Sequence, residues 1–321
     1  MLKSHNSLLN YGRISLRVLS VLLSFHLLFT PNMAFAQALE RFEFTKPKMG
    51  TNFQLIFYAN DDESAQQIAD TAFARIDQLN RILSDYLAES ELNELVQQSG
   101  NQEWVKVSDD LWEVLVYAQW VSKISHGAFD ISVQPLSKLW RKMFRQQTFP
   151  SRQKIESAKK LVNYKWIELD EQHQRVRLKK EGMRLDLGGI AKGYAVDEVM
   201  EVLKDFGVQR ALVNGGGDIR ISHAPPNQSA WAIQRQDTTL ALTNTAIATS
   251  GSTYQYLIHQ GKRYSHIIHP KTGMGITNPQ TVSVQAASCM KADAFASAFS
   301  VMKRRRSERL ARKYELLVSF D

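Results

Sequence analysis

Cysteine is almost absent from this chain. Cys289 is the single cysteine among 321 residues, so no disulfide can form within the molecule. This excludes the class of small domains that depend on cross-links, and stability must come from a core of buried apolar side chains. The sequence also has no internal repeat and no low-complexity linker, and its length alone allows either one large domain or two.

An excess of basic charge spread over the chain is missing as well. The formal net charge is +8, but residues 1–36 contribute +3 and residues 303–313 contribute +6, which leaves the rest at about −1. Proteins that bind nucleic acid usually carry a basic stripe across a domain, so we expect no nucleic-acid partner. The basic segment near the C-terminus, with Leu310, Tyr314 and Leu317 at helical spacing, is predicted to be a helix that packs on the core. Its basic face could also contact anionic lipid peripherally.

The leading apolar run is too short to span a membrane. It covers residues 18–29, fewer than the roughly 20 residues that a spanning helix needs. Basic residues precede the run and a small-x-small sequence ending at Ala36 follows it, an order typical of a secretory signal peptide. The basic residues are Lys3, Arg13 and Arg17. We predict a signal peptide over residues 1–36, cut after Ala36, and an exported, periplasmic domain over residues 37–321, without a lipid anchor because no cysteine stands at the end of the run.

The two common glycine motifs for phosphate are also missing. Residues 184–197 read Arg-Leu-Asp-Leu-Gly-Gly-Ile-Ala-Lys-Gly-Tyr-Ala-Val-Asp, a spacing that fits neither the Rossmann nor the P-loop pattern. The segment nevertheless predicts a glycine turn between a strand and a helix, where free backbone N–H groups favour an anion. Taken alone, a structural turn beside a solvated Lys192 is the better interpretation.

What is present is a strong pattern of alternating and helical periodicity. Residues 64–83 place apolar side chains on one helical face, and a second helix begins at a Ser108 cap and ends near Gly127. Residues 141–157 are basic and polar and are predicted to be a surface connection. Strands are predicted at residues 42–44, 53–58, 166–169, 176–178, 211–213, 219–221, 231–233, 240–242, 246–249, 266–268 and 281–286. Strands outnumber helices and several adjoin through short turns, which favours an α+β fold over a doubly wound sheet.

Several further segments resemble one known family. They are Met49-Gly50-Thr51, Ser84-Asp85-Tyr86, Ser90-Glu91-Leu92, Gly127-Ala128-Phe129-Asp130-Ile131-Ser132-Val133, Asn214-Gly215-Gly216-Gly217-Asp218, Thr249-Ser250-Gly251-Ser252, Ser265-His266-Ile267-Ile268-His269-Pro270-Lys271-Thr272-Gly273 and Ala292-Asp293-Ala294-Phe295-Ala296-Ser297-Ala298. With residues 184–197 they follow the order of the ApbE-type flavin transferases, which are FAD:protein FMN transferases. The resemblance implies one compact, T-fold-like α+β unit with a mixed β-sheet and two sub-lobes around a flavin-binding cleft.

A candidate metal site follows from the spacing of Asp293 and Ser297. Residues four apart in a helix share one face, and hard oxygen ligands of this kind suit Mg²⁺. Taken alone, an acid near a helix N-terminus is more often structural. The resemblance implies that Mg²⁺ is bound by Asp293, by Ser297 where the family usually has threonine, and by the backbone carbonyl of Gly189.

His266 is the candidate general base. Imidazole is partly unprotonated near neutral pH and can accept a proton, although a lone histidine is more often structural. The resemblance implies that His266 deprotonates the acceptor hydroxyl. His269 stands where the family often has aspartate, which makes it a rival candidate.

The resemblance also implies a set of residues that line the FAD site. They are Met49, Tyr86, Ala128, Phe129, Asp130, Asp186, Lys192 and Ile267. Tyr86 and Phe129 can pack against flat rings, and Lys192 can neutralise a pyrophosphate oxygen. Without the family, these residues would be interpreted as core aromatics and a solvated lysine, and Asp218 receives no role beyond a tight turn.

The resemblance implies Mg²⁺-dependent transfer of FMN from FAD to a Ser or Thr hydroxyl of a target flavoprotein, which leaves AMP. The acceptor is expected to be an extracytoplasmic segment of a respiratory flavoprotein. Two alternatives stay open: an FAD pyrophosphatase that gives FMN and AMP, and an extracytoplasmic FAD-binding protein without turnover.

Overall fold

The computed structural model describes residues 39–321, apart from Gln236, residues 252–255 and Pro279. These residues form one compact unit. The predicted signal peptide, residues 1–36, and Ser252 of the motif series lie outside the described residues. Within the described part of the chain, no helix is both long enough and apolar enough to cross a membrane.

The main sheet has seven strands in the order β1-β2-β6-β7-β10-β13-β14. The strands are β1 (Glu40–Lys48), β2 (Thr51–Ala59), β6 (Ala211–Gly215), β7 (Asp218–Ile221), β10 (Thr245–Gly251), β13 (Thr281–Ala286) and β14 (Leu317–Phe320). The α+β class is therefore confirmed, but the expected mixed sheet is wrong in detail: each neighbouring pair in this sheet is antiparallel. Tight turns join β1 to β2 and β6 to β7, and a turn that reverses the chain allows only antiparallel neighbours in those two pairs.

The side chains of β2 alternate between two cores. Phe53, Leu55 and Phe57 point into the main hydrophobic core, whereas Ile56 points to the opposite face, as the two-residue period of a strand requires. On that opposite face lies the hairpin of β8 (Trp231–Arg235) and β9 (Thr238–Leu242), which covers a small cluster around Trp231. Both faces of the sheet centre are thus shielded from water.

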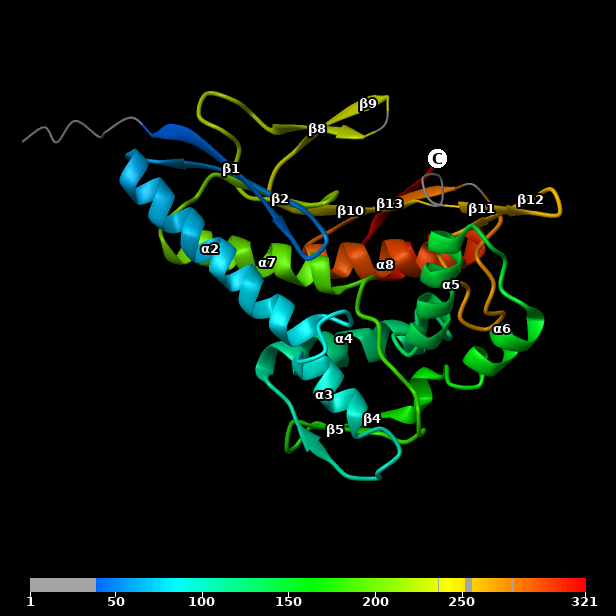
Figure 1. Cartoon of the computed structure of the whole chain (residues 1–321). Coiled ribbons are helices and arrows are strands. Elements are labelled where there is room, and N and C mark those ends of the chain that lie inside the picture. The colour runs from blue at the N-terminus through cyan, green and yellow to red at the C-terminus, as the bar shows by residue number, and fades with distance from the viewer. Residues whose placement is uncertain (1–38, 236, 252–255, 279) are drawn as a thin grey trace, which may run out of the picture. The chain divides into compact units, whose positions relative to one another are not determined.

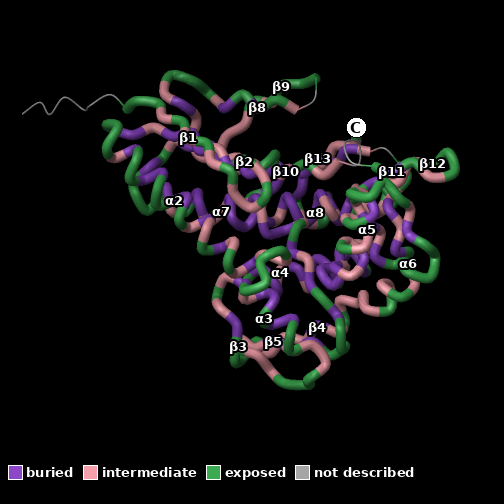
Figure 2. The backbone as a smooth tube through the Cα atoms, viewed as in Figure 1, coloured by how far each residue is buried: buried purple, intermediate pink, exposed green. Residues whose placement is uncertain are grey.

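Helices α2 (Asp62–Leu83), α7 (Ala191–Asp205) and α8 (Cys289–Val301) run along the other face of the sheet (Figure 1). Buried positions concentrate in this layer (Figure 2). The helix predicted at residues 64–83 is confirmed, and its first turn is capped by Asp61, whose carboxylate accepts a hydrogen bond from the Ser64 N–H at 2.7 Å. Helices α3 (Glu91–Gln97) and α4 (Asp109–Ile124) extend the core, and Ser108 caps α4 as predicted.

The surface connection predicted at residues 141–157 is wrong. The structure has α5 (Gln134–Gln146) and α6 (Arg152–Lys159) there. The prediction failed because it weighed only the cations on the exposed side of α5. The other side of this helix carries a buried apolar stripe at helical spacing, formed by Leu136, Trp140 and Met143. This stripe packs with the hairpin of β11 (Tyr256–His259) and β12 (Lys262–Ser265) in a separate core cluster, which gives the unit a second sub-lobe.

Three smaller features complete the fold. The predicted hairpin is present as β4 (Ile167–Asp170) and β5 (Arg175–Leu178). Strand β5 also pairs with β3 (Val105–Lys106), and the 3-10 turn η1 (Tyr164–Trp166) precedes β4. Residues 266–268 are not a strand, since their one ladder contact is the isolated bridge between Ile268 and Gly275. The basic segment forms α9 (Arg304–Lys313) as predicted, but Leu317 belongs to β14 because Glu315, at φ +55°, ends the helical course of the chain.

Candidate active site

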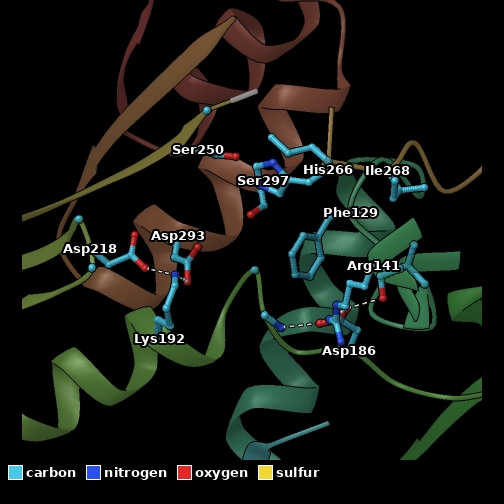
Figure 3. A pocket seen from close by; sticks show the side chains of 18 of the residues that line it. Phe129, Arg141, Asp186, Lys192, Asp218, Ser250, His266, Ile268, Asp293 and Ser297 are labelled. Carbon is cyan, nitrogen blue, oxygen red and sulfur yellow. Dashed lines mark hydrogen bonds and ion pairs between the residues drawn. The ribbon is translucent and has the colours of Figure 1, made fainter. Parts of the chain in front are cut away.

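A cavity of about 2130 Å³ lies where the two sub-lobes meet. Its walls come from the loop after α4, from α5, from residues 184–189 and the first turn of α7, from the β6–β7 turn, from β10, from the segment after β12, and from α8. Figure 3 shows His266, Ser297 and Phe129 grouped on one part of the wall and Lys192, Asp218 and Asp293 on another. Segments that are far apart in the sequence thus converge on one space.

Lys192, Asp218 and Asp293 form a buried charged cluster in the cavity wall. The Lys192 ammonium donates a hydrogen bond to Asp218 and lies 3.7 Å from the Asp293 carboxylate. Burial favours the neutral amine of Lys192, but the charges of Asp293 and Asp218 outweigh it and raise the pKa of the lysine. Burial, together with the charge of Asp218, raises the pKa of Asp293 to about 7. The alternative of a lysine that contacts only solvent does not hold, since two carboxylates contact its ammonium.

Close backbone approach brings α7 and the glycine turn against α8. A Cβ on Gly193 would lie 2.5 Å from the Cys289 carbonyl oxygen, and one on Gly189 would lie 2.8 Å from the Ser297 hydroxyl. At Gly193 only glycine fits, because the neighbouring atom belongs to the backbone, whereas at Gly189 the Ser297 side chain would have to move. The Gly193 N–H donates to the Asp293 carboxylate at 3.2 Å, so the first turn of α7 faces the acid of α8.

The oxygen donors expected for Mg²⁺ lie together in this region. Asp293 and Ser297 are on the same face of α8, both line the cavity, and Gly189 is directly beside Ser297. Two buried carboxylates share one lysine here, so the cluster carries excess negative charge that a divalent cation would offset. The described residues contain no group of three or more His, Cys, Asp or Glu side chains that could hold a metal. The expected donors are few and are all oxygen atoms, a chemistry that suits an ion that takes few protein ligands and shares substrate phosphates, as Mg²⁺ does.

Arg141 of α5 organises the opposite wall. Its guanidinium donates to Asp85 and to Asp186, each at 2.6 Å, and lies 4.5 Å from the ring centre of Tyr86. Burial and the charge of Asp186 raise the pKa of Asp85 despite this partner. Three-quarters of Tyr86 is exposed at the cavity, so its ring is open to a flat ligand. Asp186 also accepts from the Gly188 N–H at 2.9 Å, which ties the glycine turn to α5.

The loop after α4 presents Ala128 and Phe129 to the cavity, as expected for the FAD site. Asp130 lines it too, but its carboxylate is already occupied: one oxygen accepts from the N–H and hydroxyl of Ser132, and the other accepts from the Tyr164 N–H at 3.0 Å. Burial raises the pKa of Asp130. In this structure Asp130 shapes the loop that carries Phe129.

The two candidate histidines differ in position. His266 is exposed and lines the cavity together with Ile267. The ring of His269 accepts a hydrogen bond from the Lys271 N–H at 3.2 Å within a turn, and burial lowers the pKa of this imidazole. The geometry therefore favours His266 as the base.

Met49 is the one predicted FAD residue that the structure does not bring to the cavity lining. It occupies the β1–β2 turn with φ +48°, next to Gly50 at φ +76°. The turn still lies near the site, because the Gly216 N–H donates to the Asn52 carbonyl at 3.2 Å.

Sequence reasoning missed Asp218, Asp85 and Arg141 as site residues. Asp218 stands in a glycine-rich motif and Asp85 in the Ser-Asp-Tyr motif, so their positions were visible but their partners were not. Arg141 lies in the basic stretch that was interpreted as a loop. Only its partners distinguish it from the exposed cations around it.

Solved flavin transferases have this fold. The flavin transferase ApbE from Vibrio cholerae superposes with a TM-score of 0.79 at 26% identity, over 88% of this chain and 94% of that one. The ApbE protein from Thermotoga maritima superposes with a TM-score of 0.77 at 28% identity, over 88% and 96% of the two chains. The fold and the cavity thus define an enzyme of the flavin transferase class.

The sequence comparisons agree with the structural ones. A model of the ApbE family matches residues 49–319. The FAD:protein FMN transferase of Chlamydia pneumoniae is 32% identical over 245 residues, which are 74% of this chain and 76% of that protein, and its counterpart in Klebsiella pneumoniae is 30% identical over 236 residues, 72% of each. The chain belongs to the ApbE family, and the assignment made from its motifs is confirmed.

Proposed function

We propose that the chain transfers FMN from FAD to a Ser or Thr hydroxyl of a target flavoprotein and releases AMP. One observation carries the proposal: a single cavity holds His266, the Asp293–Ser297 pair and the first turn of α7. Its volume of about 2130 Å³ exceeds the roughly 300–1,000 Å³ of ordinary small-ligand pockets, which leaves room for a dinucleotide and an incoming side chain. FAD as the substrate and flavin transfer as the reaction are proposed because the relatives are named FAD:protein FMN transferases.

In this reaction the acceptor oxygen attacks the phosphorus on the FMN side of the pyrophosphate, and the bond to the AMP phosphate breaks. His266 takes the hydroxyl proton, which general-base catalysis requires near neutral pH. Tyr86 and Phe129 are placed to pack on the flat rings of FAD. Arg141 and Asp186 hold the glycine turn in position against α5.

Asp293, Ser297 and the Gly189 carbonyl are the groups proposed to hold Mg²⁺. Bound there, the ion would supply positive charge to the pyrophosphate as negative charge develops on the leaving phosphate. The chain's own part is to keep these oxygens fixed. Asp197 of α7 accepts hydrogen bonds from the Cys289 and Met290 N–H groups at 2.8 Å each. These bonds fix the start of α8 against α7 and thereby the position of Asp293 one turn further along the helix.

The location of the enzyme is also proposed. The order of basic residues, apolar run and small residues before Gln37 supports export to the periplasm, where the acceptor would be an extracytoplasmic flavoprotein domain. Intact-mass measurement of the protein from a periplasmic extract should give a chain that begins at Gln37. A chain that keeps its first residues and stays in the cytoplasm would contradict this.

Product analysis tests the proposed reaction. Purified protein is mixed with FAD, Mg²⁺ and a flavoprotein acceptor domain, and the acceptor is examined by in-gel flavin fluorescence after denaturation. Fluorescence on the acceptor together with equimolar AMP supports transfer. Free FMN and AMP without labelled acceptor would instead show pyrophosphatase activity, and unchanged FAD would show binding without turnover.

A further inference from the structure

The exposed sides of α5 and α6 carry cations without carboxylate partners. They are Lys138, Lys142, Arg145, Arg152, Lys154 and Lys160. None of the six forms an ion pair or a side-chain hydrogen bond with another described residue. The one acid of this helical pair, Glu156, is engaged by Lys159 at 2.8 Å. Glu156 also attracts Arg152 and Lys160 electrostatically, so one carboxylate is shared by several cations and the surface keeps an excess of positive charge.

Part of this charge surrounds a groove between the two helices. The groove has a volume of about 550 Å³ and is lined by Pro135, Lys138, Leu139, Lys142, Arg145, Gln153, Lys154, Ser157 and Ala158. Its lining combines apolar groups with four cations and includes no acid. We call it the α5–α6 groove. Such a surface fits a partner segment that is apolar in part and negatively charged.

The α5–α6 groove adjoins the active-site cavity. Lys138 and Arg145 line both. A protein whose side chain enters the cavity must leave the rest of its surface against the rim, and on the α5 side that rim is this groove. An acceptor protein is therefore the partner that meets the cations whenever its hydroxyl reaches His266.

We propose that the α5–α6 groove docks an acidic surface of the acceptor protein and so orients the acceptor hydroxyl toward the cavity. This proposal rests on the proposed transferase function. A lipid surface laid on α5 and α6 would cover the shared rim and obstruct the acceptor, so the geometry favours a protein partner over a membrane.

The charge distribution of the rest of the molecule supports an oriented approach. Exposed acids of the other sub-lobe stand at the start of α2 (Asp62 and Glu63) and in α3 (Glu94). These acids repel an acidic partner, whereas α5 and α6 attract it; α9 is a second basic surface, but it lies outside the groove. Complementary charge of this kind raises association rates and selects one orientation of the encounter.

The test uses two double charge reversals. Lys142→Glu/Lys154→Glu changes cations that line the groove but not the cavity. Arg305→Glu/Arg309→Glu makes the same change in charge on α9, where both arginines are exposed and lack an ion pair within the described chain, and the cavity lining ends at Val301 before α9 begins. The α9 variant is thus a control for net charge alone.

Initial rates of FMN transfer are measured against the concentration of an acceptor domain that the wild type labels. The groove variant should raise KM for this acceptor about tenfold or more at low salt while kcat stays unchanged, because the cations act on the encounter. The difference should shrink at about 0.5 M salt. The dissociation constant of FAD should be unchanged in both variants, and the control should keep the wild-type KM.

Other results would overturn the docking proposal. Equal changes in both variants would reveal an effect of net charge, weaker FAD binding in the groove variant would assign the cations to the nucleotide, and loss of binding to phosphatidylglycerol vesicles with an unchanged KM would assign them to lipid. A wild type that labels no acceptor would remove the transferase function and the docking proposal together. A wild type that labels its acceptor, with an unchanged KM in the groove variant, would remove the docking proposal alone.

Discussion

The ammonium of Lys192 lies 3.7 Å from the carboxylate of Asp293, and the same ammonium is hydrogen-bonded to Asp218. One cation is therefore shared by two buried acids. The negative charge of the two carboxylates is balanced only in part by the single ammonium. The stability of the folded chain should therefore depend on pH and on added cations. The first prediction concerns that sensitivity.

Without metal, the protein should be more stable at pH 6 than at pH 8 because of Asp293. Its pKa in the folded chain is raised to about 7, above the value of about 3.9 expected when unfolded. The stabilisation from the protonated acid is complete below the unfolded pKa and is lost as pH rises through about 7. Between pH 6 and pH 8 this should lower the free energy of unfolding by on the order of 1 kcal/mol.

Chemical denaturation in the presence of a chelator measures this slope. Asp293→Asn removes the titrating group and should flatten it, whereas Asp205→Asn, at an exposed position at the end of α7, should leave it as in the wild type. An unchanged slope in Asp293→Asn would show that other groups cause the pH dependence.

The second prediction separates the two histidines. His266→Asn should lower the rate of FMN transfer by roughly 10²- to 10⁴-fold, the usual contribution of a positioned general base, with FAD still bound. His269→Asn should change the rate little, since the ring of His269 is engaged with the Lys271 N–H. Single-turnover rates and FAD titrations check both. The reverse ranking of the two variants would make His269 the base.

The third prediction concerns the glycine turn. Gly189→Val would push a side chain into Ser297 and Phe129, so it should weaken both FAD and Mg²⁺ binding. Lys192→Ala should leave Asp218 and Asp293 without their shared cation, so it should lower the melting temperature as well as FAD affinity. Because two buried carboxylates hold the ammonium at short range, salt should alter the lysine effect little.

Calorimetric titration with FAD and with Mg²⁺ decides this prediction. Gly207→Ala serves as a distant comparison, since it lies past the end of α7 and a Cβ there meets nothing within 4 Å, although its φ of +78° adds strain. Full FAD affinity in both Gly189→Val and Lys192→Ala would remove the turn from the binding site.

The fourth prediction uses the single cysteine. Cys289 is fully buried, and burial together with the charges of Asp218, Asp197 and Asp293 raises the pKa of its thiol. A low fraction of thiolate and poor access both slow thiol chemistry. A disulfide reagent should therefore leave the native protein unmodified and label one equivalent after denaturation. Rapid labelling of native protein would show that α7 and α8 separate readily at Gly193.

The regular elements were predictable where burial is one-sided. The helix at residues 64–83 and the hairpin of β4 and β5 show clear periodicity, because one face packs and the other is hydrated. Helix α5 was not predicted, because its second half is rich in cations and resembles a polar surface segment. The apolar stripe of Leu136, Trp140 and Met143 has helical spacing only when the whole of residues 134–146 is considered.

The candidate site was predictable residue by residue but not as a set of partners. His266, Asp293 and Lys192 were identified from motifs, and all three line the cavity. The pairing of Lys192 with Asp218 depends on how α7 meets the β6–β7 turn, which no local pattern specifies. In the same way, the ion pairs of Arg141 with Asp85 and Asp186 could not be predicted, because both acids lie far from Arg141 in the sequence.

The pairing of β2 with β6 has a consequence for how the enzyme assembles. These neighbours are separated by the whole stretch between Ala59 and Ala211, which holds α2 through α7. Non-local strand pairing closes a large loop and is slow, whereas helices form quickly. The cavity needs the β6–β7 turn as well as α5 and α7. On refolding, FAD binding should therefore return with the slow phase in which the sheet closes, after most of the helical signal has recovered.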